Sequence, residues 1–358
     1  MEVRIGVPHM GNFYIAFETL VRELGITPVV PPRPSRASIE FGISHSPEFI
    51  CFPFKATLGD LKMALKLGAN TLVWFEGAWS CRFGYYGRLQ HRILKDLGYE
   101  FNSLIFSGNP IDAFRDARKA LKFDTMRFVK AVRIAYSKSK AVELTEKLAL
   151  NTRPFELNRG DTTRVERTAL QLIRKARTVA EVRYLRGKIT EMFKSIPVDK
   201  TRNPLKIWLV GEIYMVLEPE ANFHIVEYLG EHGVLVRPFT TIHNWTFRSI
   251  RAGRYGPEGE AYARELAKPY LPYCLGGEEQ LSIGYTIMAK RKGYDGVIHL
   301  HPFTCMPENV AYPILQNLST RYDIPLLSIS LDEHTESVGL LTRVEAFLDL
   351  LQQRHTNG

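Results

Sequence analysis

Four cysteines, Cys51, Cys81, Cys274 and Cys305, are the residues of this chain whose type and spacing point most directly to chemistry. Cys51 and Cys81 lie 30 residues apart, and Cys274 and Cys305 lie 31 apart. In a reducing compartment, cysteines that the fold brings together are more often metal ligands or redox groups than disulfides. The paired spacing therefore predicts two similar half-molecules that offer cysteines to a metal or an iron–sulfur cluster.

The same order of elements is expected between the members of each pair. A helical segment is followed by a glycine stop, Gly68 or Gly293, and then by a short apolar strand, residues 71–75 or 296–300. Cys305 follows its strand within the loop His-Pro-Phe-Thr-Cys-Met-Pro. Open α/β sheets hold their ligands at the carboxyl ends of the strands, so this loop is expected at a binding edge.

The residues leave three other interpretations of the cysteines open. Buried cysteines often serve only as small apolar side chains. A four-cysteine zinc site is a second interpretation, although structural zinc usually takes close cysteine pairs that this chain lacks. The third is a catalytic pair of Cys305 with His299 or His301, for which no third group is evident. A cluster is favoured by aromatic residues that would exclude water, namely Phe49, Phe52, Phe54, Trp79, Phe83, Tyr273 and Phe303.

The elements that position these cysteines follow from hydrophobic periodicity. Short apolar strands alternate with amphipathic helices at both ends of the chain, which predicts an α/β fold of two Rossmann- or flavodoxin-like, doubly wound lobes. Between the lobes the pattern changes to long helices, over 112–150 and 163–193. We expect an N-terminal lobe at 1–110, a helical insert at 111–203 and a C-terminal lobe at 204–358. A helix is also predicted from Glu220 to Glu231.

The positive charge belongs to the insert. The chain has 47 Lys+Arg and 38 Asp+Glu, and residues 111–200 hold 22 and 11 of them. The remaining 25 and 27 nearly cancel, so a nucleic-acid partner is disfavoured for most of the chain. Aromatic residues are sparse in the insert, which disfavours it there too. No apolar run of 18 residues and no signal-like start occur, which predicts a cytoplasmic protein without membrane contact.

Seven stretches carry a resemblance to a known family. The chain resembles the 2-hydroxyacyl-CoA dehydratase family, which includes the 2-hydroxyglutaryl-CoA dehydratase D-component and activase-related proteins. Both lobes take part in the match. The stretches are IGVPHMGNFY (5–14), CFPFK (51–55), SCRFGYYG (80–87), GEIYMVLEPEANFHIVEYLGEHG (211–233), HLHPFTCMPE (299–308), PLLSISLDEHT (325–335) and TRVEAF (342–347).

The resemblance implies an iron–sulfur protein of anaerobic metabolism. Its cofactor would be a [4Fe–4S] cluster or a double-cubane [8Fe–9S] cluster held by Cys51, Cys81 and Cys305, with Cys274 as an optional fourth ligand. Three thiolates would leave one iron open for substrate, whereas a fourth would favour plain electron transfer.

The partner implied by the resemblance is an ATP-hydrolysing activator of the actin and sugar-kinase superfold. A related cluster-bearing subunit or a second copy, and an acyl-CoA substrate, are further implied partners. The chain itself lacks GxxxxGK[ST], so ATP hydrolysis by it is not expected. The role would be that of an electron-transfer, reductase or dehydratase (lyase) component. The alternative is a cluster-free scaffold that binds a partner or nucleic acid through the basic insert.

A few polar residues have structural and functional interpretations side by side. Lys55 could offset cluster charge or meet an anionic substrate. Glu212 could face the ligand or cap a helix. Asp332 is expected to shape a loop or cap a helix, and Arg343 to pair with Asp332 or Glu333.

Overall fold

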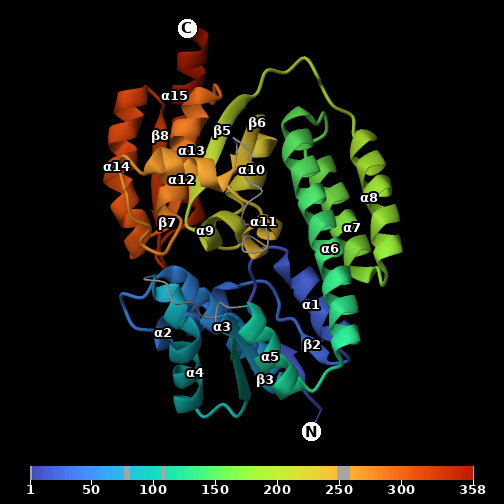
Figure 1. Cartoon of the computed structure of the whole chain (residues 1–358). Helices are drawn as coiled ribbons and strands as arrows, with labels where there is room; N and C mark the ends of the chain where they lie inside the picture. Colours follow the sequence, from blue (N-terminus) through green and yellow to red (C-terminus); the bar gives the residue numbers. More distant parts are fainter. Residues whose placement is uncertain (1, 76–80, 107–109, 248–258, 358) are drawn as a thin grey trace. The chain divides into compact units, whose positions relative to one another are not determined.

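The structure, a computed structural model, describes residues 2–75, 81–106, 110–247 and 259–357. It divides into two compact units, Met1–Ala141 with Ile173–Arg183, and Val142–Leu172 with Tyr184–Gly358. Each unit contains one four-stranded sheet in which every strand pair is parallel (Figure 1). The predicted α/β class is therefore confirmed. Among the helices of these ranges, none combines the length and apolar character needed to cross a membrane.

The sheet of the first unit has the strand order β2-β1-β3-β4. Its two faces carry separate apolar cores, because successive strand residues point to opposite faces. Leu72 and Trp74 pack with α3 and α4, whereas Val73 packs with Phe17 of α1. Helices therefore cover both faces, as expected of a doubly wound sheet. The elements are β1 (Arg4–Gly6), α1 (Phe13–Glu23), β2 (Thr27–Val29), α2 (Arg36–His45), α3 (Phe52–Lys66), β3 (Thr71–Phe75), η1 (Arg82–Tyr85), α4 (Tyr86–Asp96), β4 (Asn102–Phe106) and α5 (Pro110–Leu121).

The sheet of the second unit repeats this plan with the order β6-β5-β7-β8. Gly296 of β7 lies against Phe347 and Leu351 of α15, and His299 on the opposite face bonds Glu308 of α14. The elements are β5 (Leu205–Gly211), α9 (Ile213–Leu217), α10 (Ile225–Glu231), β6 (Val234–Pro238), α11 (Ile242–Thr246), α12 (Glu260–Ala267), α13 (Glu279–Arg291), β7 (Gly296–Pro302), α14 (Met306–Tyr322), β8 (Leu326–Leu331) and α15 (Ser337–Asn357).

The repeat inferred from the cysteine spacing is present in the backbone. Helix α3 ends before Gly68, strand β3 follows, and Cys81 comes after the strand. In the second unit α13, Gly293, β7 and Cys305 follow in the same order. Gly68 has φ +89° and Gly293 has φ +66°, the left-handed conformation that glycine adopts at little cost.

The segment predicted as an insert is helical throughout most of its length. It contains α6 (Thr125–Thr152), η2 (Arg153–Phe155), α7 (Asp161–Lys175) and α8 (Val179–Lys194). Its helices contribute to both units, and the predicted boundaries at 110 and 203 remain predictions. The helix predicted over 163–193 is two helices, because Thr178 caps α8. Its Oγ1 accepts from Glu181 N at 3.1 Å, and Glu181 accepts from Arg177 N.

Two other sequence predictions need correction. The helix predicted to begin at Glu220 begins at Ile225, because Phe223 and His224 have φ values of +55° and +56° and cannot continue a right-handed helix. Helix α2 was not predicted. Its signal is a capping box, in which Ser35 Oγ accepts from Ser38 N while Ser38 Oγ accepts from Ser35 N.

Candidate functional site

Two cysteine-bearing loops meet in the first unit. Cys51 precedes the first residue of α3 and is buried, with its Sγ 2.5 Å from Tyr86 Oη on α4. Cys81 likewise directly precedes the first residue of η1. Arg82 Nη1 donates to the Phe49 carbonyl at 2.6 Å, which ties the Cys81 loop to the Cys51 loop. The structure therefore brings the segments of Cys51 and Cys81 together.

Lys55 helps to hold the Cys51 loop in place. Its side chain is 2% exposed, and Nζ donates to the Glu48 carbonyl at 3.1 Å. Because a buried ammonium needs a hydrogen-bond acceptor, this contact couples the first turn of α3 to the chain just before Cys51. In this structure Lys55 thus acts on the loop backbone.

The aromatic residues near the cysteines are only partly as expected. Phe52 and Phe54 are buried, and Phe83 packs against the same core. Phe49, Tyr273 and Phe303 are instead exposed, by 70%, 76% and 59%. The expectation that every flanking aromatic residue excludes water is therefore wrong for these three. Trp79 lies outside the described residues.

A second pair of loops meets in the second unit. Cys305 directly precedes α14 and is buried, while Cys274 is exposed and its Sγ accepts from Gly276 N at 3.4 Å. A Cβ added to Gly277 would lie 2.7 Å from the Pro307 side chain, so the Cys274 loop packs closely against the Cys305 loop. Glu279 fixes the first loop by accepting from Leu275 N and Gly277 N.

Beside Cys305, two fully buried side chains, His299 and Glu308, form a hydrogen-bonded series with the half-buried Ser328. His299 Nε2 is 2.9 Å from Glu308 Oε2, and His299 Nδ1 is 2.9 Å from Ser328 Oγ. Burial lowers the pKa of His299 to about 3 and raises the pKa of Glu308 to about 8. Both groups are therefore uncharged at neutral pH, and the protonated Glu308 carboxyl donates to the imidazole. His301 stacks on His299 at 4.6 Å, and burial lowers its pKa to about 4.

Other carboxyl groups lie close to His299 and Glu308. Burial, followed by the charges of Glu308 and Glu278, raises the pKa of Glu212 to about 7. Glu212 also caps α9, accepting from Met215 N at 3.0 Å, as one of its two predicted roles requires. Glu278 and Glu279 are buried at the start of α13. A pair of carboxyl groups with raised pKa values, Glu212 and Glu308, at a strand end is typical of functional sites.

The sequence analysis missed three of these acids, Glu278, Glu279 and Glu308. A signal existed for Glu308, which ends the stretch HLHPFTCMPE three residues after Cys305. In a helix that spacing brings it near the same face as the N-terminal cysteine. The buried environment that perturbs its pKa has no counterpart in the local sequence.

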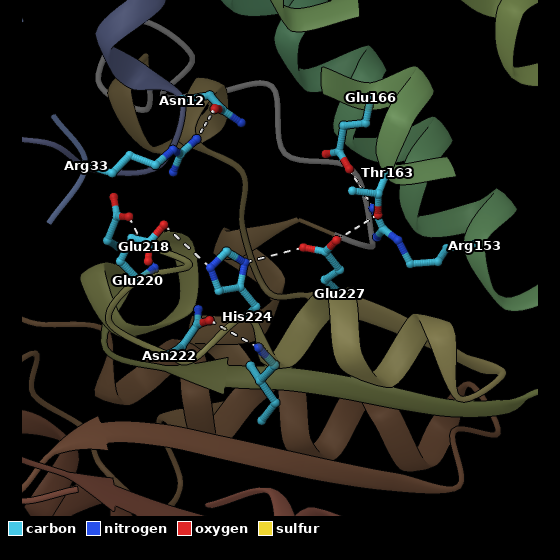
Figure 2. Close-up of polar contacts among 11 residues, drawn as sticks. Asn12, Arg33, Arg153, Thr163, Glu166, Glu218, Glu220, Asn222, His224 and Glu227 are labelled. Carbon is cyan, nitrogen blue, oxygen red and sulfur yellow. Dashed lines mark hydrogen bonds and ion pairs between the residues drawn. The ribbon is translucent and has the colours of Figure 1, made fainter. Parts of the chain in front are cut away.

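The stretch 218–224 forms a separate polar junction in the second unit. Figure 2 shows His224 between two carboxylates, Glu220 at 3.5 Å and Glu227 at 3.3 Å. Glu227 also accepts from Thr163 Oγ1 at 2.7 Å, and Arg153 pairs with Glu166 at 2.6 Å. The hydrogen bond with His224 is the largest cause that lowers the pKa of Glu227 to about 2.

This junction ties helix α7 to helix α10. The same contacts raise the pKa of His224. The positive φ of His224 aims its ring between the two carboxylates, so the left-handed backbone and the charges support each other. The family-like stretch 211–233 therefore supplies contacts that hold α7 and α10 together.

The remaining candidates on the last strand and helix are structural. Arg343 Nη2 donates to the Ser328 carbonyl at 3.0 Å, and its ion pair with Asp332 or Glu333 stays a prediction. Asp332 shapes a loop, as predicted, by accepting from His334 N and Thr335 Oγ1. Glu345 accepts from Tyr228 Oη.

Fold and site together define a two-sheet α/β protein in which three cysteines, Cys51, Cys81 and Cys305, directly precede a helix, and in each unit the two cysteine-bearing loops are in contact. In the part of the chain that is described, no three His, Cys, Asp or Glu side chains are grouped so that they could hold a metal ion. A family model for the 2-hydroxyglutaryl-CoA dehydratase D-component matches residues 114–351, more than half of the chain. The chain therefore belongs to this family, as its resemblance predicted.

The matched range includes Cys274 and Cys305 and leaves Cys51 and Cys81 outside it. No curated protein matches the chain.

Proposed function

We propose that this dehydratase-family component carries a [4Fe–4S] or double-cubane cluster and works with an ATP-hydrolysing activator. The observation that carries the proposal is that cysteine-bearing loops are joined to each other in both units, by Arg82–Phe49 in one and Gly277–Pro307 in the other. Membership of a family that is generally associated with iron–sulfur clusters and with an activator supports it.

The chemistry of the donor set fits such a cluster. Cys51, Cys81 and Cys305 each directly precede a helical turn, where backbone N–H groups and the positive end of the helix dipole favour a thiolate. These three residues would hold the cluster. Cys274 differs, because it is exposed and lies five residues before α13, so we assign it an optional role. When bound, the cluster supplies low-potential one-electron chemistry.

The protein's own residues position Cys305. Glu308 lies on the first turn of α14, and its bond to His299 holds that turn on strand β7. Ser328 of β8 fixes the other side of the imidazole. Because His299 and Glu308 are fully buried and hydrogen-bonded to each other, they restrict the movement of the helix start that carries Cys305.

Anaerobic purification and reconstitution test the proposal. We expect a brown protein with iron and sulfide in similar amounts and a [4Fe–4S] signal in electron paramagnetic resonance after reduction. Replacing Cys305 or Cys81 by Ser should abolish most of the bound iron. The matched control Cys274→Ser should keep it.

A colourless, iron-free product after reconstitution would overturn the proposal. If that product also bound nucleic acid or an acidic protein in a salt-dependent manner, the scaffold alternative would replace it. Equal loss of iron in Cys274→Ser and Cys305→Ser would instead require four thiolate ligands and favour electron transfer as the role.

A further inference from the structure

A cavity of about 540 Å³ opens in the first unit, where the end of α1 meets the first turns of α6. It is lined by Arg22, Glu23, Gly25, Met126, Arg127 and Lys130. A smaller cavity of about 270 Å³ shares Met126 and Lys130 and extends along α6 to Arg133. The combined space is thus bordered by four basic side chains and one acidic side chain.

Arg22 has more hydrogen-bond donors than the described residues around it satisfy. Arg22 Nη1 donates to Glu18 at 3.2 Å, yet its Nε and Nη2 are buried without a hydrogen-bond partner among the described residues. Glu23, the acid in the lining, lies 3.7 Å from Lys130. Arg22 therefore brings to the cavity wall a positive charge that its single hydrogen bond to Glu18 does not saturate.

A further positive charge, that of Lys138, lies close to Arg22. Lys138 is fully buried and donates to the Arg174 carbonyl at 2.8 Å. Burial and then the charge of Arg22 lower the pKa of Lys138 to about 8, and burial followed by Arg177 lowers the pKa of Arg22. These cations repel one another inside the fold, and a bound anion would relieve that repulsion.

We propose that this cavity binds the phosphate groups of a small organic phosphate. The planar guanidinium groups of Arg22 and Arg127 suit phosphate oxygens, and Lys130 adds a flexible third cation. Met126 and Val129 beside it are 75% and 45% exposed and offer apolar contact to the organic part of the ligand. The inference does not depend on the proposed cluster, because none of these residues belongs to it.

Calorimetric titration of the purified chain tests the site. The probes are sodium pyrophosphate and adenosine 3′,5′-bisphosphate, each at constant ionic strength adjusted with sodium chloride. We expect both to bind, with the nucleotide tighter because of the apolar rim. The double variant Arg22→Gln/Arg127→Gln should raise the Kd of both probes at least about tenfold, since it removes charge-assisted hydrogen bonds.

The matched control is Arg36→Gln/Arg92→Gln. It removes the same charge from exposed positions of the same unit, where the arginines pair with Glu40 and Asp96. Its Kd should stay within about twofold of the unmodified chain, because salt screens distant surface charges. Equal weakening in both double variants would show unspecific attraction and overturn the proposal.

Two single variants separate binding from folding. Arg22→Gln should leave the Tm of the ligand-free chain unchanged or raise it, because it removes a charge that Arg177 and Arg174 repel, and this gain offsets the loss of the ion pair with Glu18. The more accessible Lys130→Gln should weaken binding without a change in Tm. Polyglutamate binding as tightly as the nucleotide, or undiminished binding in Lys130→Gln together with a lowered Tm in Arg22→Gln, would overturn the inference.

Discussion

Glu308 is a residue whose ionisation depends strongly on the fold. Burial raises its pKa from about 4.5 to about 8, so the folded state holds the proton more tightly than the unfolded state. The resulting stabilisation is fully present below about pH 4.5 and is lost as the pH rises toward 8. Glu212 acts in the same direction, with a pKa raised to about 7.

We therefore predict that Glu308→Gln flattens the alkaline side of the stability profile. The amide keeps a hydrogen bond to His299 but carries no titrating proton. Thermal unfolding from pH 6 to 9 should show a smaller decline in Tm for Glu308→Gln than for the unmodified chain. The surface variant Glu265→Gln serves as the control. Identical declines in all three proteins would contradict the assignment.

His299 and His301 act in the opposite direction on the same profile. Burial lowers the pKa of His299 to about 3 and of His301 to about 4. Each contributes stability above about pH 6.5 that is lost as the pH falls toward its folded pKa. Below about pH 6.5 these histidine contributions oppose that of Glu308, and Glu308→Gln should change the profile throughout the interval from about pH 4.5 to about pH 8.

At the scale of elements, the contact of Gly277 with Pro307 sets the spacing between two cysteine loops. A methyl group at Gly277 would lie 2.7 Å from the proline ring, and a ring cannot turn away as a flexible side chain can. We predict that Gly277→Ala destabilises the chain by about 1–3 kcal/mol, as overpacking does. It should also reduce the iron retained after reconstitution.

Gly187→Ala is the matched control for this change. Gly187 is exposed on α8, and an added Cβ meets nothing within 4 Å. Alanine there should stabilise the helix by about 0.5–1 kcal/mol. Chemical denaturation measures both effects. A neutral or stabilising Gly277→Ala would show that the two loops can separate without cost.

For the whole molecule, the two sheets should remain folded without a cluster. Each unit buries its own apolar core of strand and helix residues, to which the buried Cys51 and Cys305 add only two small side chains. We predict that chelation of the iron leaves the far-ultraviolet circular dichroism spectrum largely unchanged. The Tm should fall, because a ligand that binds only the folded state stabilises it.

The opposite outcome would be loss of the helical spectrum together with the iron. Small metal-dependent domains behave in this way, because metal binding supplies their folding free energy. In that case the cores of the two units would be insufficient for folding, and the cysteines would have a structural role in addition to the proposed one.

The sequence by itself determined the elements around the cysteines. Strands β3 and β7, the stops at Gly68 and Gly293 and the repeated order of elements follow from local signals, because apolar runs and glycines act within a few residues. Helix starts that depend on a single capping side chain were harder to predict. Ser35 and Thr178 place helix starts through one or two hydrogen bonds that hydrophobic periodicity does not register.

Only the tertiary structure decided which groups meet and in which charge state. Gly277 and Pro307, Arg82 and Phe49, and Glu308 and His299 are contacts between elements, and their energies depend on burial that no local pattern encodes. The same holds for Arg22, whose unsatisfied donors arise only when α1 and α6 pack together. Periodicity predicts that a face is buried, whereas the pKa of a group depends on the particular atoms packed against it.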